Sequence, residues 1–275
     1  MKRELELERR LRSLRKLAEA VRAMKGLSAH HYREARQAVS TARNYREGVE
    51  RILAWANASL AGGGGEAGLL IIGGELGLCG SYNSQIVGFA AEQRRQLGPG
   101  PTFCVGHRAS ALLGRHGVDV QASYEGPTSV RGISSLLSSL AEDLLTRYAI
   151  EGLASIDIVA SEFRGVGSFT PQRVRLLPFA SEPSRLSRSA HYVDRPRFAS
   201  VAAREFLFIT LYDLLLDALA CEHAARLLAT QAAESWLDER IEGLRRHLTA
   251  ARREATTQEM LEIAAGAPNR RAMLE

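Results

Sequence analysis

The stretch LERRLRSLRKLAEAV at residues 7–21 predicts the fold of this chain. Its apolar residues follow a 4-3-4-3 spacing: Leu7, Leu11, Leu14, Ala18 and Val21. This spacing is typical of the apolar seam of a coiled coil, in which two helices bury one face against each other. The sequence therefore predicts a helix here that needs a partner helix.

A matching segment lies near the other end of the chain, and an apolar stripe precedes it. The segment comprises Ile241, Leu244, Leu248, Ala251 and Ala255, and the stripe comprises Leu211, Leu215, Ala218, Ala225 and Leu228. No proline occurs before Pro99 or between Pro196 and Pro268. Because proline inside a helix costs about 3 kcal/mol, both proline-free regions can hold unusually long helices. We predict that helices over residues 4–59 and 202–265 pair with each other.

The region between these helices alternates between strand and helix patterns. Strands are predicted at 68–73, 102–106, 118–124, 155–164 and 173–179, and helices at 81–97, 109–117 and 133–150. This alternation favours a Rossmann-like α/β domain with a largely parallel sheet. The predicted fold class is a long antiparallel coiled coil of the N- and C-terminal helices with an inserted α/β domain. The predicted divisions are a shaft helix at 1–60, a foot domain at 66–184, a connecting loop at 185–201, a shaft helix at 202–267 and a tail at 268–275.

Composition and charge narrow the class of protein. The apolar runs at 68–72 and 211–220 are far shorter than the roughly 20 residues that cross a bilayer, and the charged N-terminus lacks a secretory core. We therefore expect a soluble, cytosolic chain without direct bilayer insertion. Residues 1–60 hold 14 Lys+Arg against 7 Asp+Glu, whereas residues 201–275 hold 9 against 12. Two interpretations remain open: the two ends face each other, or the first meets an acidic partner.

The sequence GGELGLCGSYN at residues 73–83 lies where nucleotide-binding folds place a phosphate loop. A P-loop needs the pattern GxxxxGK followed by Ser or Thr, and a dinucleotide loop needs GxGxxG. Neither pattern is present. A glycine-permitted strand-to-helix turn is the favoured interpretation. Cys79 has no neighbouring base that could activate it as a nucleophile, and Cys104 and Cys221 are typical of core packing.

The histidines and basic residues favour structural roles over chemical ones. The seven histidines form no HExxH or other metal-ligand spacing, so no metal site is predicted. Glu222 and His223 are interpreted as polar contacts across helices. The basic first helix is compatible with nucleic acid, but Glu4, Glu6 and Glu8 alternate with its arginines. A solvated coiled-coil face is favoured, and no nucleic-acid partner is expected.

Three sequence blocks are spread along the chain: AMKGLSA from Ala23, GLCGSYN at residues 77–83, and EHAARL at 222–227 combined with TTQEMLEIAAGA at 256–267. These blocks resemble the gamma subunit of F-type ATP synthases, whose N-terminal block reads AMKMVA. The blocks stand in the family's order and span nearly the whole chain. The resemblance therefore implies the same fold as the periodicity predicts.

The resemblance implies a mechanical role. The coiled coil would turn inside a ring of alternating alpha and beta subunits, and the foot domain would rest, with the epsilon subunit, on the ring of c subunits that ion flow turns. Such a rotor couples ion flow to ATP synthesis or hydrolysis, is no enzyme by itself, and holds no nucleotide, metal or cofactor. It would lie peripherally on the cytoplasmic face of a bacterial membrane.

The resemblance also implies roles for particular residues. Subunit-contact candidates are Met24, Lys25, Arg252, Arg253, Gln258 and Glu259. The turn of the foot domain is carried by Gly77, Cys79, Gly80 and Asn83, and the shaft block by Glu222, His223 and Arg226. Leu261 stands where the family has threonine, which changes the expected catch contacts. Together with only three lysines and the tail PNRRAMLE, this favours a divergent bacterial branch such as the alternate, N-type ATPases.

Two other functions fit parts of the same sequence. A stand-alone α/β enzyme with a coiled-coil arm would carry a substrate pocket at the carboxyl ends of its strands. A basic coiled-coil scaffold would bind nucleic acid with steep salt dependence.

Overall fold

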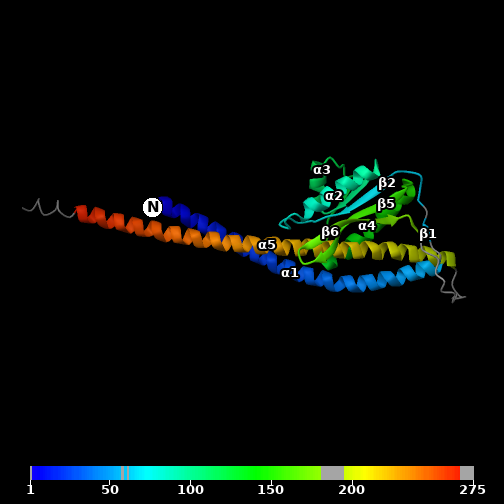
Figure 1. Ribbon diagram of the computed structural model, residues 1–275, viewed down its shortest axis with the longest axis horizontal. Coiled ribbons are helices and arrows are strands. Elements are labelled where there is room, and N and C mark those ends of the chain that lie inside the picture. The colour runs from blue at the N-terminus through cyan, green and yellow to red at the C-terminus, as the bar shows by residue number, and fades with distance from the viewer. Residues whose placement is uncertain (1, 57–58, 61, 181–194, 267–275) are drawn as a thin grey trace, which may run out of the picture. The chain divides into compact units, whose positions relative to one another are not determined.

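The computed structural model describes residues 2–56, 59–60, 62–180 and 195–266, so the predicted tail at 268–275 and most of the predicted loop at 185–201 lie outside the described residues. The chain divides into two compact units. We call the described residues 2–26 and 230–266 the coiled-coil unit, and those between 27 and 229 the α/β unit. Helix α1 (Lys2–Ala56) and helix α5 (Arg195–Gly266) contribute residues to both units (Figure 1).

The coiled-coil unit confirms the predicted apolar seam. Leu11, Ala18 and Val21 of α1 are buried against Leu237, Ile241 and Leu248 of α5. Partly buried Leu7, Leu14 and Leu244 extend the same cluster. The helices are antiparallel, because Arg252 contacts Glu4 and Glu8 whereas Arg22, further along α1, contacts Glu234, earlier on α5.

The α/β unit contains a five-stranded, mostly parallel sheet in the order β4-β3-β2-β5-β6. Its elements in chain order are β2 (Ala67–Ile72), α2 (Tyr82–Leu97), β3 (Thr102–Val105), α3 (His107–Arg115), β4 (Ala122–Tyr124), α4 (Val130–Ile150), β5 (Ser155–Gly165) and β6 (Ser168–Leu177). The first four strands in this order pair in parallel, and β6 joins β5 as an antiparallel hairpin. A separate two-stranded pair consists of β1 (Ser59–Leu60) and β7 (Phe179–Ala180).

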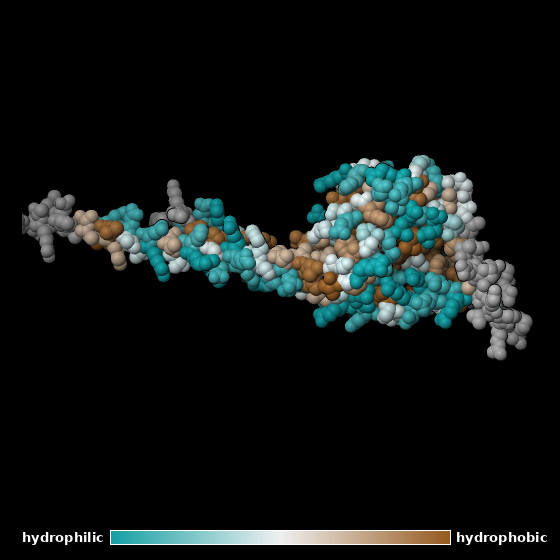
Figure 2. Space-filling view, viewed as in Figure 1, coloured by the Kyte–Doolittle hydropathy of each residue, from teal (hydrophilic) through white to brown (hydrophobic). Residues whose placement is uncertain are grey.

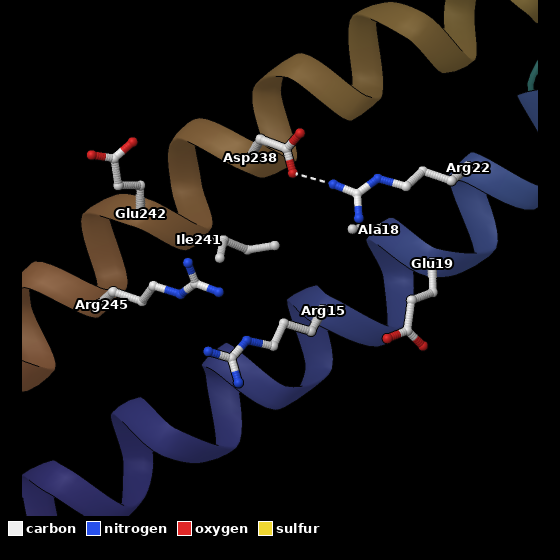
Figure 3. A pocket seen from close by; sticks show the side chains of 8 residues that line it. All are labelled: Arg15, Ala18, Glu19, Arg22, Asp238, Ile241, Glu242 and Arg245. Carbon is white, nitrogen blue, oxygen red and sulfur yellow. Dashed lines mark hydrogen bonds and ion pairs between the residues drawn. The ribbon is translucent and has the colours of Figure 1, made fainter.

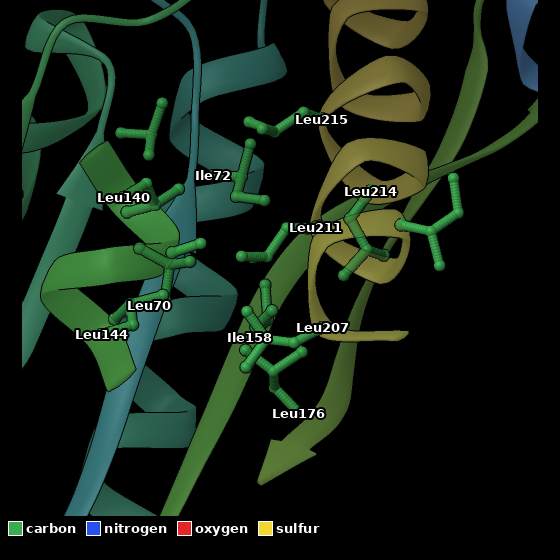
Figure 4. Packing of buried hydrophobic residues seen from close by; sticks show 14 of the residues in the cluster. Leu70, Ile72, Leu140, Leu144, Ile158, Leu176, Leu207, Leu211, Leu214 and Leu215 are labelled. Atoms are coloured by element: carbon green, nitrogen blue, oxygen red, sulfur yellow. The ribbon is translucent and has the colours of Figure 1, made fainter. Parts of the chain in front are cut away.

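Strand β2 shows how this sheet forms two cores. Leu69 and Ile71 belong to a cluster with residues of α2 and α3, whereas Leu70 and Ile72 belong to a cluster with residues of α4, α1 and α5. Successive side chains of a strand point to opposite faces, so a strand covered on both faces is apolar throughout. Figure 4 shows Leu70 and Ile72 between leucines of α4 and α5. The apolar run GLLII therefore forms the centre of the fold.

Several element bounds differ from the sequence prediction. Helix α5 begins at Arg195, seven residues before the predicted start at 202, because a proline such as Pro196 is tolerated in the first turn of a helix. Strand β4 contains only three residues of the predicted strand at 118–124. Leu228, predicted within the apolar stripe of α5, is 42% exposed.

The packing of the α/β unit predicts a large difference between two leucine substitutions. Leu140 of α4 is fully buried, whereas Leu27 of α1 is 58% exposed. Replacing Leu140 by alanine should lower the free energy of unfolding by about 2–5 kcal/mol, because it removes buried methyl groups and leaves a cavity. Leu27→Ala is the matched control and should change stability by less than about 0.5 kcal/mol. Denaturant unfolding measures both, and equal losses would contradict the packing described here.

Candidate functional site

The glycine-rich turn connects the end of β2 to the start of α2. Gly80 adopts a left-handed conformation with φ of 57°, which glycine enters without steric penalty. Leu78 adopts a similar conformation with φ of 60°, although it carries a side chain, and that side chain is 60% exposed. Non-glycine residues in this region are uncommon and persist where surrounding contacts hold them. Contacts with the surrounding structure, rather than the intrinsic backbone preference of leucine, therefore keep the turn in this conformation.

Helix α5 supplies the contacts that hold this turn. The Leu76 N–H donates to Glu222 Oε1 at 3.4 Å, and Arg226 Nε donates to the Gly77 carbonyl at 3.0 Å. A Cβ atom added to Gly74 would lie 3.1 Å from the Glu222 carboxyl carbon, so a side chain there would crowd the contact. The turn does bind an anion through its backbone, but this anion is a carboxylate of the same chain.

Glu222 and Arg226 form a buried ion pair. Their exposed fractions are 5% and 2%, and the guanidinium contacts the carboxylate directly across one turn of α5. Burial raises the pKa of the Glu222 carboxyl group, and the adjacent Arg226 charge offsets part of this effect. Because both charges are removed from water, each depends on the other and on the backbone groups of the turn.

His223 lies beside this pair and is fixed as a neutral ring. Arg226 Nη1 can only donate, so at 3.2 Å it makes His223 Nδ1 the acceptor. The other nitrogen, Nε2, then carries the proton and donates to the Thr128 carbonyl at 3.2 Å. Burial, and secondly the Arg226 charge, lower the pKa of His223 to about 4. The ring is therefore a structural link between α5 and the loop before α4.

Cys79 and Asn83 complete the turn. The Gly74 N–H donates to Asn83 Oδ1 at 2.7 Å, and Asn83 Nδ2 donates to Cys79 Sγ at 3.4 Å. Burial raises the pKa of the Cys79 thiol, and it raises that of Cys104 to about 12. These thiols are protonated at neutral pH and unsuited to attack, because the nucleophile is the thiolate. The arrangement agrees with the structural interpretation of the cysteines.

The predicted subunit-contact residues lie in the coiled-coil unit and do not gather at one point. Lys25 Nζ donates to Glu234 Oε2 at 2.6 Å, and Met24 beside it is partly buried. Arg252 Nε donates to Glu4 at 2.8 Å, so it lies opposite the other end of this α1 segment. Arg253, Gln258 and Glu259 have exposed side chains on α5.

The C-terminal part of α5 exposes large apolar side chains. Met260, Leu261 and Ile263 are 66%, 65% and 73% exposed. Figure 2 shows brown, hydrophobic side chains on the visible face near this end of the helix. A run of exposed apolar residues of this kind is typical of a surface that another molecule covers.

Charged side chains line an open groove of about 640 Å³ in the coiled-coil unit (Figure 3). Arg22 Nη2 donates to Asp238 Oδ1 at 2.7 Å along it, and Arg15 and Arg245 extend into it from opposite helices. Pockets for small substrates are mainly apolar, whereas this lining is mainly polar. The groove therefore resembles a solvated face of a helix pair.

A second charged cluster lies in the α/β unit and was not predicted from the sequence. Asp213 and Asp217 of α5 are almost fully buried, and arginines of α1 contact them: Arg36, Arg43 and Arg46. The signal was present in the run LYDLLLDALA, where two aspartates four residues apart share one helix face. Together with Arg22 and Lys25, these contacts confirm that basic residues of the first segment face acidic residues of the last.

Comparison with known proteins gives the family. The sequence model described as ATP synthase matches residues 4–269. This chain belongs to the ATP synthase gamma chain family. The gamma chain of Desulforamulus reducens is 28% identical over 95% of this chain and 97% of its own length, and that of Moorella thermoacetica is equally similar over the same shares.

Solved structures confirm the gamma-chain fold. A chain of the Euglena gracilis mitochondrial ATP synthase, in an OSCP/F1/c-ring structure, aligns with a TM-score of 0.71 at 13% identity, over 100% of this chain and 96% of that chain. A chain of the Tetrahymena thermophila central stalk and c-ring structure aligns with a TM-score of 0.63 at 21% identity, over 78% and 99%. As a gamma chain, the protein is a non-catalytic central-stalk subunit of ATP synthase. Within the described residues, no helix is apolar for long enough to span a membrane.

The buried ion pair predicts an asymmetric response to substitution. Replacing Arg226 by methionine should destabilise the α/β unit by about 3–5 kcal/mol, because Glu222 would stay buried without its charge partner. The double variant Glu222→Gln/Arg226→Met should lose less than the arginine variant alone. Chemical denaturation of the three proteins measures this difference, and a double variant at least as unstable as Arg226→Met would rule out the mechanism.

The buried, neutral His223 predicts a loss of stability in mild acid. The unfolded chain binds a proton near the ordinary pKa of 6.5, whereas the folded chain binds it only near 4, so stability should fall as the pH drops through that interval. The expected contribution of this residue is roughly 3 kcal/mol. Unfolding is measured in EDTA, which removes trace metal ions. His223→Gln should flatten the pH dependence of the free energy of unfolding. The exposed control, His116→Gln, should retain the wild-type slope.

Proposed function

We propose that this gamma chain is the rotor that couples ion flow through a membrane sector to ATP synthesis or hydrolysis on a ring of alpha and beta subunits. The observation that carries the proposal is the exposed apolar end of α5, on a chain whose family match covers residues 4–269. Those side chains remain uncovered by the described part of the chain, although the rest of the helix pair buries its apolar seam. A surrounding ring of subunits supplies the missing cover.

The same proposal assigns roles to the predicted contact residues. Met24, Lys25, Arg252, Arg253, Gln258 and Glu259 would face the alpha and beta subunits. Exposed ion pairs such as that of Arg252 with Glu4 contribute little stability, so they can exchange partners as the rotor turns. A bearing surface of screened charges does not lock at one angle, as a large apolar interface would.

The α/β unit would serve as the foot that meets the epsilon subunit and the c ring, on the cytoplasmic face of a bacterial membrane. The buried contacts of Glu222, His223 and Arg226 with the turn of Gly77, Cys79, Gly80 and Asn83 would keep this foot attached to α5. Glu222 also occupies the carboxyl end of β2, close to where a stand-alone α/β enzyme would bind its substrate. This placement disfavours the enzyme alternative.

A proline in the coiled coil tests the rotor directly. Leu248 is 8% exposed in the seam of α5, and proline there should break the helix at a cost of about 3 kcal/mol or more. Complexes assembled with the alpha, beta and membrane subunits should lose ATP-driven ion pumping in vesicles, or fail to assemble. The control is His247→Ala, an exposed neighbour on the same helix, which should pump normally.

Two outcomes would refute the proposed function. The first is normal pumping by the Leu248→Pro complex. The second is failure of the wild-type chain to co-purify with alpha and beta subunits from the same organism. The isolated chain should hydrolyse no ATP in the same assays.

A further inference from the structure

Helix α1 carries a cluster of three side chains of metal-ligand type in the α/β unit, next to His223 of α5. His30, His31 and Glu34 each offer one ligand atom, and these atoms all lie within 4.8 Å of one another. His30 and Glu34 are four residues apart and therefore share one face of the helix. Sequence analysis predicts no metal site here, because the spacing HHxxE is not an established ligand motif.

The geometry of the cluster matches a small transition-metal ion. His31 Nδ1 and Glu34 Oε2 are 3.4 Å apart. Zinc binds imidazole nitrogen and carboxylate oxygen at roughly 2.0–2.2 Å, so two ligand atoms at the tetrahedral angle lie about 3.3–3.5 Å apart. Two ligand atoms are therefore already spaced for a shared ion, and the ligand atom of His30 lies within 4.8 Å of both.

Neighbouring rings orient the cluster. The His31 ring lies 5.1 Å from the His223 ring and 5.2 Å from the His30 ring. Both nitrogens of His223 are already engaged, with Thr128 and Arg226, so His223 supports His31 without acting as a ligand. A metal ligand whose orientation is fixed by a second layer of contacts loses less freedom on binding.

We propose that His30, His31 and Glu34 bind one divalent transition-metal ion of the zinc class. Two imidazoles and one carboxylate suit zinc, nickel or copper, whereas magnesium and calcium prefer oxygen ligands alone. Three protein ligands leave a fourth tetrahedral position open to water or to an external ligand. This inference does not depend on the rotor function.

The test is zinc titration of the purified full chain, without a histidine tag and after EDTA treatment, by isothermal calorimetry. The wild-type chain should bind one ion, and His30→Ala and Glu34→Gln should each weaken binding at least about tenfold, since each removes a ligand. Both side chains reach the surface, so the variants should fold normally, which circular dichroism checks. His116→Ala removes an exposed histidine elsewhere in the α/β unit and is the matched control.

Imidazole NMR signals provide an independent readout on the same proteins. Zinc should shift the signals of His30 and His31 and leave those of His116 in place. The proposal is overturned if the wild-type chain binds no zinc, if His30→Ala and Glu34→Gln bind it as tightly as the wild type, or if magnesium competes equally.

Discussion

The buried ion pair of Glu222 and Arg226 is the constraint on which the α/β unit depends. Burying a carboxylate without partners costs several kcal/mol. Helix α5 can therefore pack here only if the charge of Glu222 is fully compensated. Arg226 supplies the opposite charge from the same helix, and the turn after β2 supplies a backbone N–H and a carbonyl. The turn is closely packed at Gly74, where an added Cβ atom would lie 2.8 Å from Asn83 Oδ1 and 3.1 Å from the Glu222 carboxyl carbon. The sequence blocks at residues 77–83 and 222–227, far apart in the chain, therefore form one structural unit.

In this arrangement, a carboxylate of the same chain lies against the glycine-rich turn of a Rossmann-like sheet. In parallel α/β sheets, the turn after a strand and the N-terminus of the next helix present backbone N–H groups, which commonly bind an anionic ligand. Here Glu222 satisfies that preference from within the chain. The fold thus keeps the electrostatic character of a nucleotide-binding turn and uses it for assembly. The Glu222 carboxylate of α5 occupies the position that an anionic ligand takes in such folds.

The sequence predicted the parts of the fold that depend on periodicity. The seam beginning at Leu7, the missing prolines and the alternating middle segment are local patterns, and each specified a helix or strand before its partner was known. Contacts such as that of Leu76 with Glu222 join residues 146 positions apart, so no local pattern contains them. The sequence pattern predicts a loop at 185–201, which contains Pro196, and so misses the start of α5 at Arg195, although proline also fits a first helical turn. The cluster of His30, His31 and Glu34 escaped because it matches no established spacing.

The aspartates of α5 show why charge, as well as apolar area, specifies how the two long helices pair in the α/β unit. An apolar surface tolerates small shifts, since one leucine contact resembles the next. Asp213 and Asp217 do not tolerate such shifts, because each is almost fully buried and is contacted by arginines at particular positions of α1. Sliding one helix by a turn would leave a buried carboxylate without its arginine, which costs more than the pair contributes to stability. An unpaired buried carboxylate would therefore disfavour other registers of the two helices. Under the proposed rotor function, this fixed register would let the two helices turn together instead of slipping past each other.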